Sequence, residues 1–81
     1  MAPNAKGLDD DIPTPLYEQL AAILRAQIQS GELSGRIPSI RHLAQEYEVA
    51  MGTANRALGM LKDEGLVIMR VGRGGYAAKR P

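Results

Sequence analysis

The sequence predicts a mainly α-helical domain that ends in a small β-hairpin, and three observations support this fold class. Residues 14–31 carry apolar side chains at helical spacing, and residues 37–66 contain two further periods of the same kind separated by a break. Residues 66–79 combine an apolar, β-branched run, a glycine-rich turn and a short returning run, which is the pattern of a hairpin. At 81 residues the chain holds one domain, near the lower limit for a core without disulfides or metals.

The first helix is predicted to begin near Thr14, which can cap it, with Pro15 at the first helical position, where a missing N–H donor costs nothing. It is predicted to end at Gly31. Its apolar positions form one inward stripe, so its expected role is to support the other two helices. The stripe consists of Leu16, Leu20, Ile23, Leu24 and Ile28.

Residues 37–66 read as a short helix, a tight turn and a longer helix, which is the spacing of a helix-turn-helix. Ser39 is a good N-cap for the short helix, and Gly65 is expected to supply a left-handed C-cap for the longer one. Glu48 lies in the turn, where a left-handed residue is commonly needed. The apolar stripes are Ile40, Leu43, Ala44 and Tyr47 in the short helix and Ala54, Ala57, Leu58 and Leu61 in the longer one.

Three segments follow from composition. Residues 1–12 are expected to form a disordered N-terminal arm, because they lack an apolar period and contain three adjacent aspartates. Residues 13–79 form the predicted domain, and residues 80–81 form a tail. Consecutive carboxylates without interleaved ligands or a glycine turn do not match a calcium loop, so no metal site is expected in the arm.

The net charge of +1 hides an uneven distribution. Residues 1–35 hold two basic and five acidic groups, whereas residues 65–81 hold four basic and none acidic. A localised basic surface is what phosphate binding needs, although such a segment also suits an ordinary solvated tail.

Several functional classes are excluded by what the sequence lacks. Without cysteine there is neither a disulfide nor a thiolate metal site, and the lone His42 rules out histidine-rich ligation. Neither a paired acid and base, an activated nucleophile nor a phosphate loop is present, so we expect no enzyme and no cofactor. No signal peptide and no apolar run of membrane-spanning length are found, and a cytoplasmic location without a membrane partner is the expectation.

The order of the motifs resembles the DNA-binding domain of GntR-family bacterial transcription regulators. The resemblance runs from about Pro15 to Tyr76, and the matching pieces are PLYEQLAAILRAQIQSGEL, IPSIRHLAQEYEV, ANRALGMLKDEGLV and GRGGY. It implies a three-helix winged helix-turn-helix that binds double-stranded operator DNA, usually as a homodimer on a palindrome, with the third helix in the major groove and the wing at the minor groove.

The resemblance therefore implies a sequence-specific transcription regulator of the repressor type. A winged helix that binds a protein, or an architectural module with weak non-specific DNA binding, is the alternative, because fold does not fix function. The family usually attaches this domain to a C-terminal effector-binding domain, for which the chain has no room. No small-molecule effector site is expected within it, and it is either an excised domain or a small free-standing regulator.

Family positions outside the third helix also indicate DNA contacts. Within Pro-Ser-Ile-Arg the family places a DNA-contacting arginine, and Arg41 holds that place in the first turn of a helix, where backbone N–H groups also face a phosphate. Ser39 is expected to donate to phosphate as well as to cap the helix. Tyr17 corresponds to a position often near the DNA backbone, with core packing as the alternative. At the hairpin tip, Arg73 is expected to border the minor groove, with Gly74 as a second candidate.

The third helix departs from the family pattern. The family often reads Ser-Arg-x-Thr-Val-Arg-Glu-Ala-Leu, whereas this chain reads Ala-Met-Gly-Thr-Ala-Asn-Arg-Ala-Leu over residues 50–58. Met51 and Asn55 therefore take the places of two arginines that usually reach bases or phosphates. Asparagine suits adenine and methionine offers apolar contact to a thymine methyl, so the expected operator preference shifts away from guanine.

Three further residues of this helix are predicted DNA contacts. Gly52 would let the backbone approach the groove closely, and Thr53 is a phosphate or base donor. Arg56 lies opposite the buried stripe and is expected to supply the phosphate contact that a methionine cannot. Because Ala50 replaces a serine cap, the helix start is predicted to fray in free protein and to become ordered on DNA.

Overall fold

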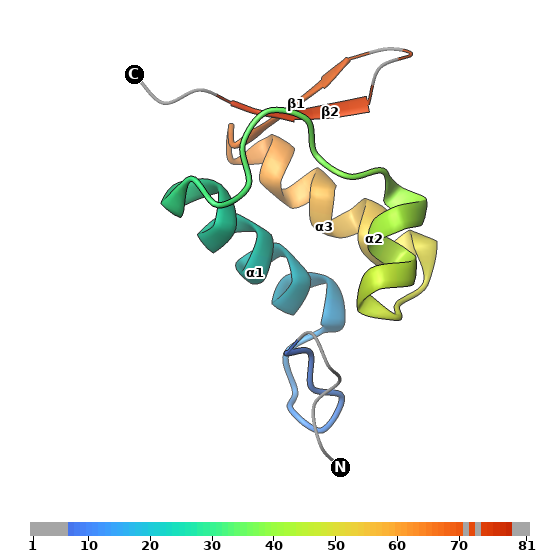
Figure 1. Ribbon diagram of the computed structural model, residues 1–81. Coiled ribbons are helices and arrows are strands. Elements are labelled where there is room, and N and C mark those ends of the chain that lie inside the picture. Colours follow the sequence, from blue (N-terminus) through green and yellow to red (C-terminus); the bar gives the residue numbers. More distant parts are fainter. Residues whose placement is uncertain (1–6, 71, 73, 79–81) are drawn as a thin grey trace.

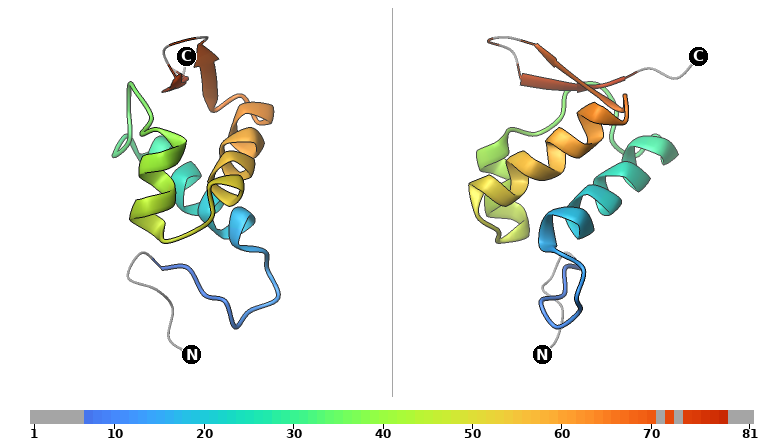
Figure 2. Two further views of the ribbon diagram at one scale, coloured as in Figure 1. Left: turned by 90° about the vertical axis from the view of Figure 1, so that its right-hand side faces the viewer. Right: turned by 180° about the vertical axis from the view of Figure 1, so that it is seen from behind.

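The computed structural model describes residues 7–70, 72 and 74–78, and it places the hairpin across one end of a three-helix unit (Figure 1). The first and second helices each pack against the third, and the hairpin follows directly from the end of the third helix (Figure 2). The predicted fold class is confirmed. The elements in chain order are α1 (Leu16–Ser30), α2 (Ile40–Tyr47), α3 (Met51–Asp63), β1 (Val67–Arg70) and β2 (Gly74–Ala77).

α1 begins differently from the prediction. Pro15, rather than Thr14, is the N-cap, and no side chain caps the helix. The side-chain amide of Gln19 explains the difference, since it donates to the carbonyl of Thr14 at 2.8 Å and to that of Asp9 at 2.9 Å. Its oxygen also accepts from the backbone N–H of Asp9 at 2.8 Å. The chain entering α1 is therefore held by Gln19 instead of by a hydroxyl cap.

The same contacts overturn part of the predicted disordered arm. Leu8 is only 2% exposed and belongs to the core, so residues 7–12 include a packed anchor instead of forming a solvated tail. The described part of the arm lies at the opposite end of the molecule from the hairpin (Figure 1). Residues 1–6 and the predicted tail at 80–81 lie outside the described residues.

The turn between α2 and α3 has the predicted geometry. Ser39 caps α2, because its hydroxyl oxygen accepts the N–H of His42 at 3.1 Å. Glu48 ends the helix in the left-handed region, with φ 57° and ψ 46°, as predicted. Ala50 then precedes α3 without a side-chain cap bond, which agrees with the weak helix start inferred from the sequence.

α3 ends in two backbone hydrogen bonds that close the helix. Gly65 has φ 79°, and its N–H donates to the carbonyl of Lys62 at 3.0 Å. The N–H of Leu66 donates to the carbonyl of Leu61 at 2.9 Å. Gly65 therefore supplies the predicted left-handed residue, one position beyond the C-cap Glu64.

The hairpin is tied to the loop before α2. β1 and β2 pair antiparallel, from Val67 opposite Ala77 to Arg70 opposite Gly74. On the other side of β2, the N–H of Ile37 donates to the carbonyl of Gly75 at 2.8 Å, and the N–H of Ala77 donates to the carbonyl of Gly35 at 2.7 Å. The loop therefore fixes where the hairpin sits relative to α2.

The core lies where the three predicted stripes and the first strand meet. Within the described part of the chain, no polar or charged side chain is buried, and none of the helices is both long and apolar enough to cross a membrane. The buried residues are Leu8, Leu20, Ala21, Leu24, Ile28, Ile37, Leu43, Ala44, Tyr47, Ala54, Ala57, Leu58, Leu61 and Val67.

Candidate nucleic-acid interface

α3 presents one face to solvent, and that face carries the predicted contacts. Met51, Gly52, Asn55 and Arg56 are exposed, with Met51 at 54%, and Thr53 is half-buried. The helix places these positions opposite the buried stripe because the two sets differ by about half a turn at 3.6 residues per turn. The donors and apolar groups predicted for base contact are thus accessible on the N-terminal half of the helix.

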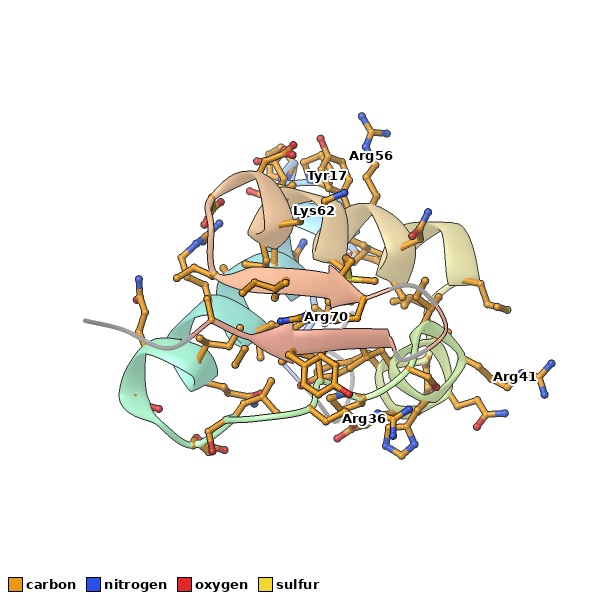
Figure 3. All side chains as sticks on the ribbon, turned by 90° about the horizontal axis from the view of Figure 1, so that it is seen from above. Tyr17, Arg36, Arg41, Arg56, Lys62 and Arg70 are labelled. Carbon is orange, nitrogen blue, oxygen red and sulfur yellow. The ribbon has the colours of Figure 1, made fainter. Side chains whose placement is uncertain are left out.

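α2 adds donors beside the start of α3. Arg41 is exposed and projects away from the helix (Figure 3), and it has no carboxylate partner among the described residues. Since the Ser39 hydroxyl uses its oxygen to accept the N–H of His42, its proton remains available for a phosphate oxygen. Both residues are therefore exposed and have donors available to a phosphate oxygen.

Arg56 is positioned by a residue far away in the sequence. Its guanidinium carbon lies 4.2 Å from the centroid of the Tyr17 ring, which comes from the first turn of α1. The pair belongs to a surface groove between α1, α3 and β1, whose lining also includes Asn55, Lys62 and Met69. The contact was not predicted, because two residues 39 positions apart give no local signal.

The hairpin can be assessed only in part. Arg73 lies outside the described residues, so its predicted role at the tip stays a prediction. Gly74 is exposed, with φ 86°, at the start of β2. Arg70 ends β1 and is exposed on the hairpin (Figure 3), a cation that sequence reasoning did not select.

Arg25 of α1 is paired with a carboxylate, whereas the arginines of α2 and α3 are not, among the residues that the structure describes. The Arg25 guanidinium donates to both carboxylate oxygens of Glu64, at 2.7 and 2.6 Å, and this hydrogen bonding holds the pKa of Glu64 below its ordinary value. The same bonds raise the pKa of Arg25. Glu64 is thereby neutralised at the end of α3, while Arg41 and Arg56 keep their charges free of carboxylates within the described part of the chain.

The chemistry of this surface is that of hydrogen-bond donation. Guanidinium and amide groups on an exposed helix match phosphate oxygens and the edges of base pairs. Over the described ranges, no group of three or more His, Cys, Asp or Glu side chains could hold a metal ion. The guanidinium and amide groups of this surface can thus donate hydrogen bonds to a nucleic acid.

The sequence of this chain is similar to that of a known transcriptional repressor. HTH-type transcriptional repressor NagR from Bacillus subtilis (strain 168) is 36% identical over 69 residues, which cover 83% of this chain and 28% of NagR. The chain thus spans less than a third of that relative's length.

Solved structures agree in fold. YtrA from Sulfolobus acidocaldarius, a GntR-family transcription factor, superposes with a TM-score of 0.81 and 35% identity, covering 90% of this chain and 79% of YtrA. AraR(DBD) in complex with operator ORE1 superposes with a TM-score of 0.77 and 27% identity, covering 88% of this chain and 89% of that one.

The family model for bacterial regulatory proteins of the gntR family matches residues 16–76, which include all three helices and nearly all of the hairpin. This match covers most of the chain, and it includes the helices and the hairpin in their order along the sequence. The protein therefore belongs to the gntR family of bacterial regulatory proteins.

Proposed function

We propose that this chain binds double-stranded operator DNA in a sequence-specific manner and acts in a transcriptional repressor. The observation that carries the proposal is the exposed face of α3, which presents Asn55 and Arg56 without carboxylate partners among the described residues, beside Arg41 of α2. NagR, named a transcriptional repressor, and the operator complex of AraR(DBD) support it.

In the proposed complex α3 enters the major groove and the hairpin borders the minor groove. Arg41 and Arg56 project from different sides of the α2–α3 pair (Figure 3), so each is assigned to a phosphate on its own side of the groove. Asn55 is assigned to adenine and Met51 to a thymine methyl. The remaining assigned contacts are Ser39, Gly52, Thr53, Arg73 and Gly74.

The chain is proposed to occupy its operator as a homodimer. Two copies on a palindrome would place two α3 helices in successive major grooves, about one helical turn of DNA apart. Titration of a palindromic duplex and of a single half-site, followed by sedimentation, tests this. A complex of one chain per palindrome would contradict it.

The central experiment is selection of bound duplexes from a random pool, followed by affinity measurement on the selected duplex at several salt concentrations. Affinity should fall steeply with salt because bound arginines release counterions. Adenine–thymine pairs should be enriched at the positions that Met51 and Asn55 contact, where arginines would favour guanine. A protein-binding module would show neither enrichment nor a steep salt dependence.

Arg41→Ala tests the phosphate contact assigned to Arg41. It should weaken binding by about 1–3 kcal/mol, on the order expected for such a contact. Arg36→Ala removes the same charge from an exposed position in the loop before α2 that is not among the assigned contacts, and it serves as the control. Equal losses for the two variants would mean that only overall charge matters and would contradict the assignment of Arg41.

A further inference from the structure

We propose that Tyr17 is a positioning residue for DNA binding, and that its ring holds the Arg56 guanidinium in place for a phosphate. This inference deepens the proposed function and rests on it. The proposed role of Tyr17 is a contact of its ring with the Arg56 side chain, and not a contact of its hydroxyl with the DNA.

The geometry is that of a cation–π contact. The guanidinium carbon of Arg56 lies over the Tyr17 ring, 4.2 Å from its centroid, well within the distance of about 6 Å at which such contacts are attractive. Tyr17 is half-buried in the first turn of α1, whereas Arg56 is exposed in the middle of α3. A fixed ring therefore restrains a side chain that would otherwise sample many rotamers.

The position of the ring follows from the packing of α1 on α3. Arg25 and Glu64 form a second contact between these helices, and both pairs are separated by 39 residues. Equal separations mean that the two helices run side by side in the same direction. The hydrogen-bonded Arg25–Glu64 pair, two turns further on, therefore fixes the alignment that brings the ring under Arg56.

The surroundings leave the guanidinium charge available. The groove that Tyr17 and Arg56 line also includes two acidic residues, Glu18 and Asp63, and the cation Lys62. Neither acidic residue forms an ion pair with Arg56 in the described part of the chain. A ring contact keeps the full positive charge and leaves N–H donors that a phosphate oxygen can accept from.

This arrangement holds one cation of α3, Arg56, in place. Figure 3 shows Tyr17, Arg56 and Lys62 together on one side of α3, while Arg41 projects from α2 elsewhere. Arg56 stands where the family pattern has a glutamate, so the ring and the cation together replace a carboxylate with a phosphate contact. Holding the side chain in advance reduces the entropy that DNA binding must overcome.

The test is a double-mutant cycle measured on the selected operator duplex. Tyr17→Phe keeps the ring and should retain full affinity. Tyr17→Leu should weaken binding about two- to fivefold, the change expected from an exposed cation–π contact. Arg56→Gln should weaken binding and lower the slope of log affinity against log salt by about one.

The coupling decides the matter. In the Arg56→Gln background, Tyr17→Leu should have no further effect, because the residue that the ring positions is gone. Equal weakening by Tyr17→Phe and Tyr17→Leu would assign the role to the hydroxyl and overturn the inference. Equal weakening by Tyr17→Leu in both backgrounds would assign it to packing alone and would also overturn it.

A spectroscopic readout separates the ring contact from folding. In free protein, the Arg56 side-chain protons should be displaced by the ring current in the native chain and in Tyr17→Phe. Absence of that displacement in both would overturn the inference even if Tyr17→Leu failed to fold. Arg41→Ala is the separate reference: if it retains full affinity and binding lacks salt dependence, the proposed function itself fails.

Discussion

Glu48 holds a backbone conformation that its side chain disfavours. Of the residues that the structure describes, it is the one non-glycine with positive φ, and it makes the tight turn between α2 and α3 possible. Its N–H donates to the carbonyl of Ala44, and the N–H of Val49 donates to the same oxygen at 3.0 Å. These two hydrogen bonds thus offset part of the free-energy cost of the left-handed conformation at Glu48.

Glu48→Gly should stabilise the domain. A left-handed conformation costs an L-residue roughly 1–2 kcal/mol, part of which is offset by the greater freedom of glycine in the unfolded chain, so a gain of about 1 kcal/mol is expected. Glu48→Ala keeps the strain while removing the carboxylate, and it should give no such gain. Thermal and urea melts of the three proteins measure the difference; no gain for glycine would contradict the strain argument.

The start of α3 is the weak point at the scale of elements. α2 begins with a serine whose side chain accepts a backbone N–H, whereas the side chain of Ala50 offers α3 no acceptor. Gly52 in the first turn costs roughly a further 1 kcal/mol relative to alanine. The helix that carries the proposed base contacts therefore begins with little local support, and its N-terminal turn depends on the packing of Ala54.

Ala50→Ser should give α3 a cap and stabilise the domain by about 1 kcal/mol. Amide exchange at residues 50–54 should slow in the variant and also when the unmodified chain binds DNA. Ala22→Ser places the same side chain at an exposed position inside α1, where it should give no gain. Equal protection of residues 50–54 with and without DNA would contradict the predicted fraying.

At the scale of the whole molecule, side chains of α1 hold other parts of the chain at two points. Near its start, Gln19 holds the backbone of Asp9 and so places Leu8 in the core. Further along, Arg25 pairs with Glu64 beyond the end of α3. These contacts connect the N-terminal segment and the C-terminal end of the helical unit, which local helix formation cannot do.

The Arg25–Glu64 pair makes stability depend on pH. Because Arg25 lowers the pKa of Glu64 in the folded state, the stabilisation is present above the unfolded pKa and is lost as pH falls through the lower, folded value. Glu64→Gln should cost about 0.2–1 kcal/mol at pH 7, as for other partly exposed pairs.

The difference in the free energy of unfolding between the native chain and Glu64→Gln should shrink as pH falls below about 4, the usual range of a glutamate pKa. Urea melts across pH 3 to 7 measure it. Glu32→Gln, at an exposed loop residue without an ion pair in the described chain, is the control and should show no comparable pH dependence. A constant difference across the range would contradict the linkage.

Leu8→Ala should destabilise the domain by about 2–5 kcal/mol, the cost of emptying a fully buried leucine site. Ile12→Ala removes an apolar side chain that is 44% exposed in the same segment and should change stability by about 0.5 kcal/mol or less. Thermal melts distinguish the two. A neutral Leu8→Ala would mean that the N-terminal segment is a solvated arm after all.

The sequence predicted the local structure because helices and strands repeat their apolar residues at short, regular spacings. Apolar stripes at 3.6-residue spacing predicted α1, α2 and α3, Ser39 and Gly65 marked helix ends, and the glycine-rich turn marked the hairpin. The same periods placed Asn55 and Arg56 on the outer side of α3, before any contact between elements was known.

Only the tertiary structure decided which distant residues meet. Leu8 entered the core, Gln19 replaced Thr14 at the start of α1, and Tyr17 came to lie under Arg56. Each depends on how α1 lies along α3 and on where the preceding segment folds back. Local periodicity records which side of a helix is buried, but it holds no information on the offset between two packed helices, so these contacts had no signal within the sequence.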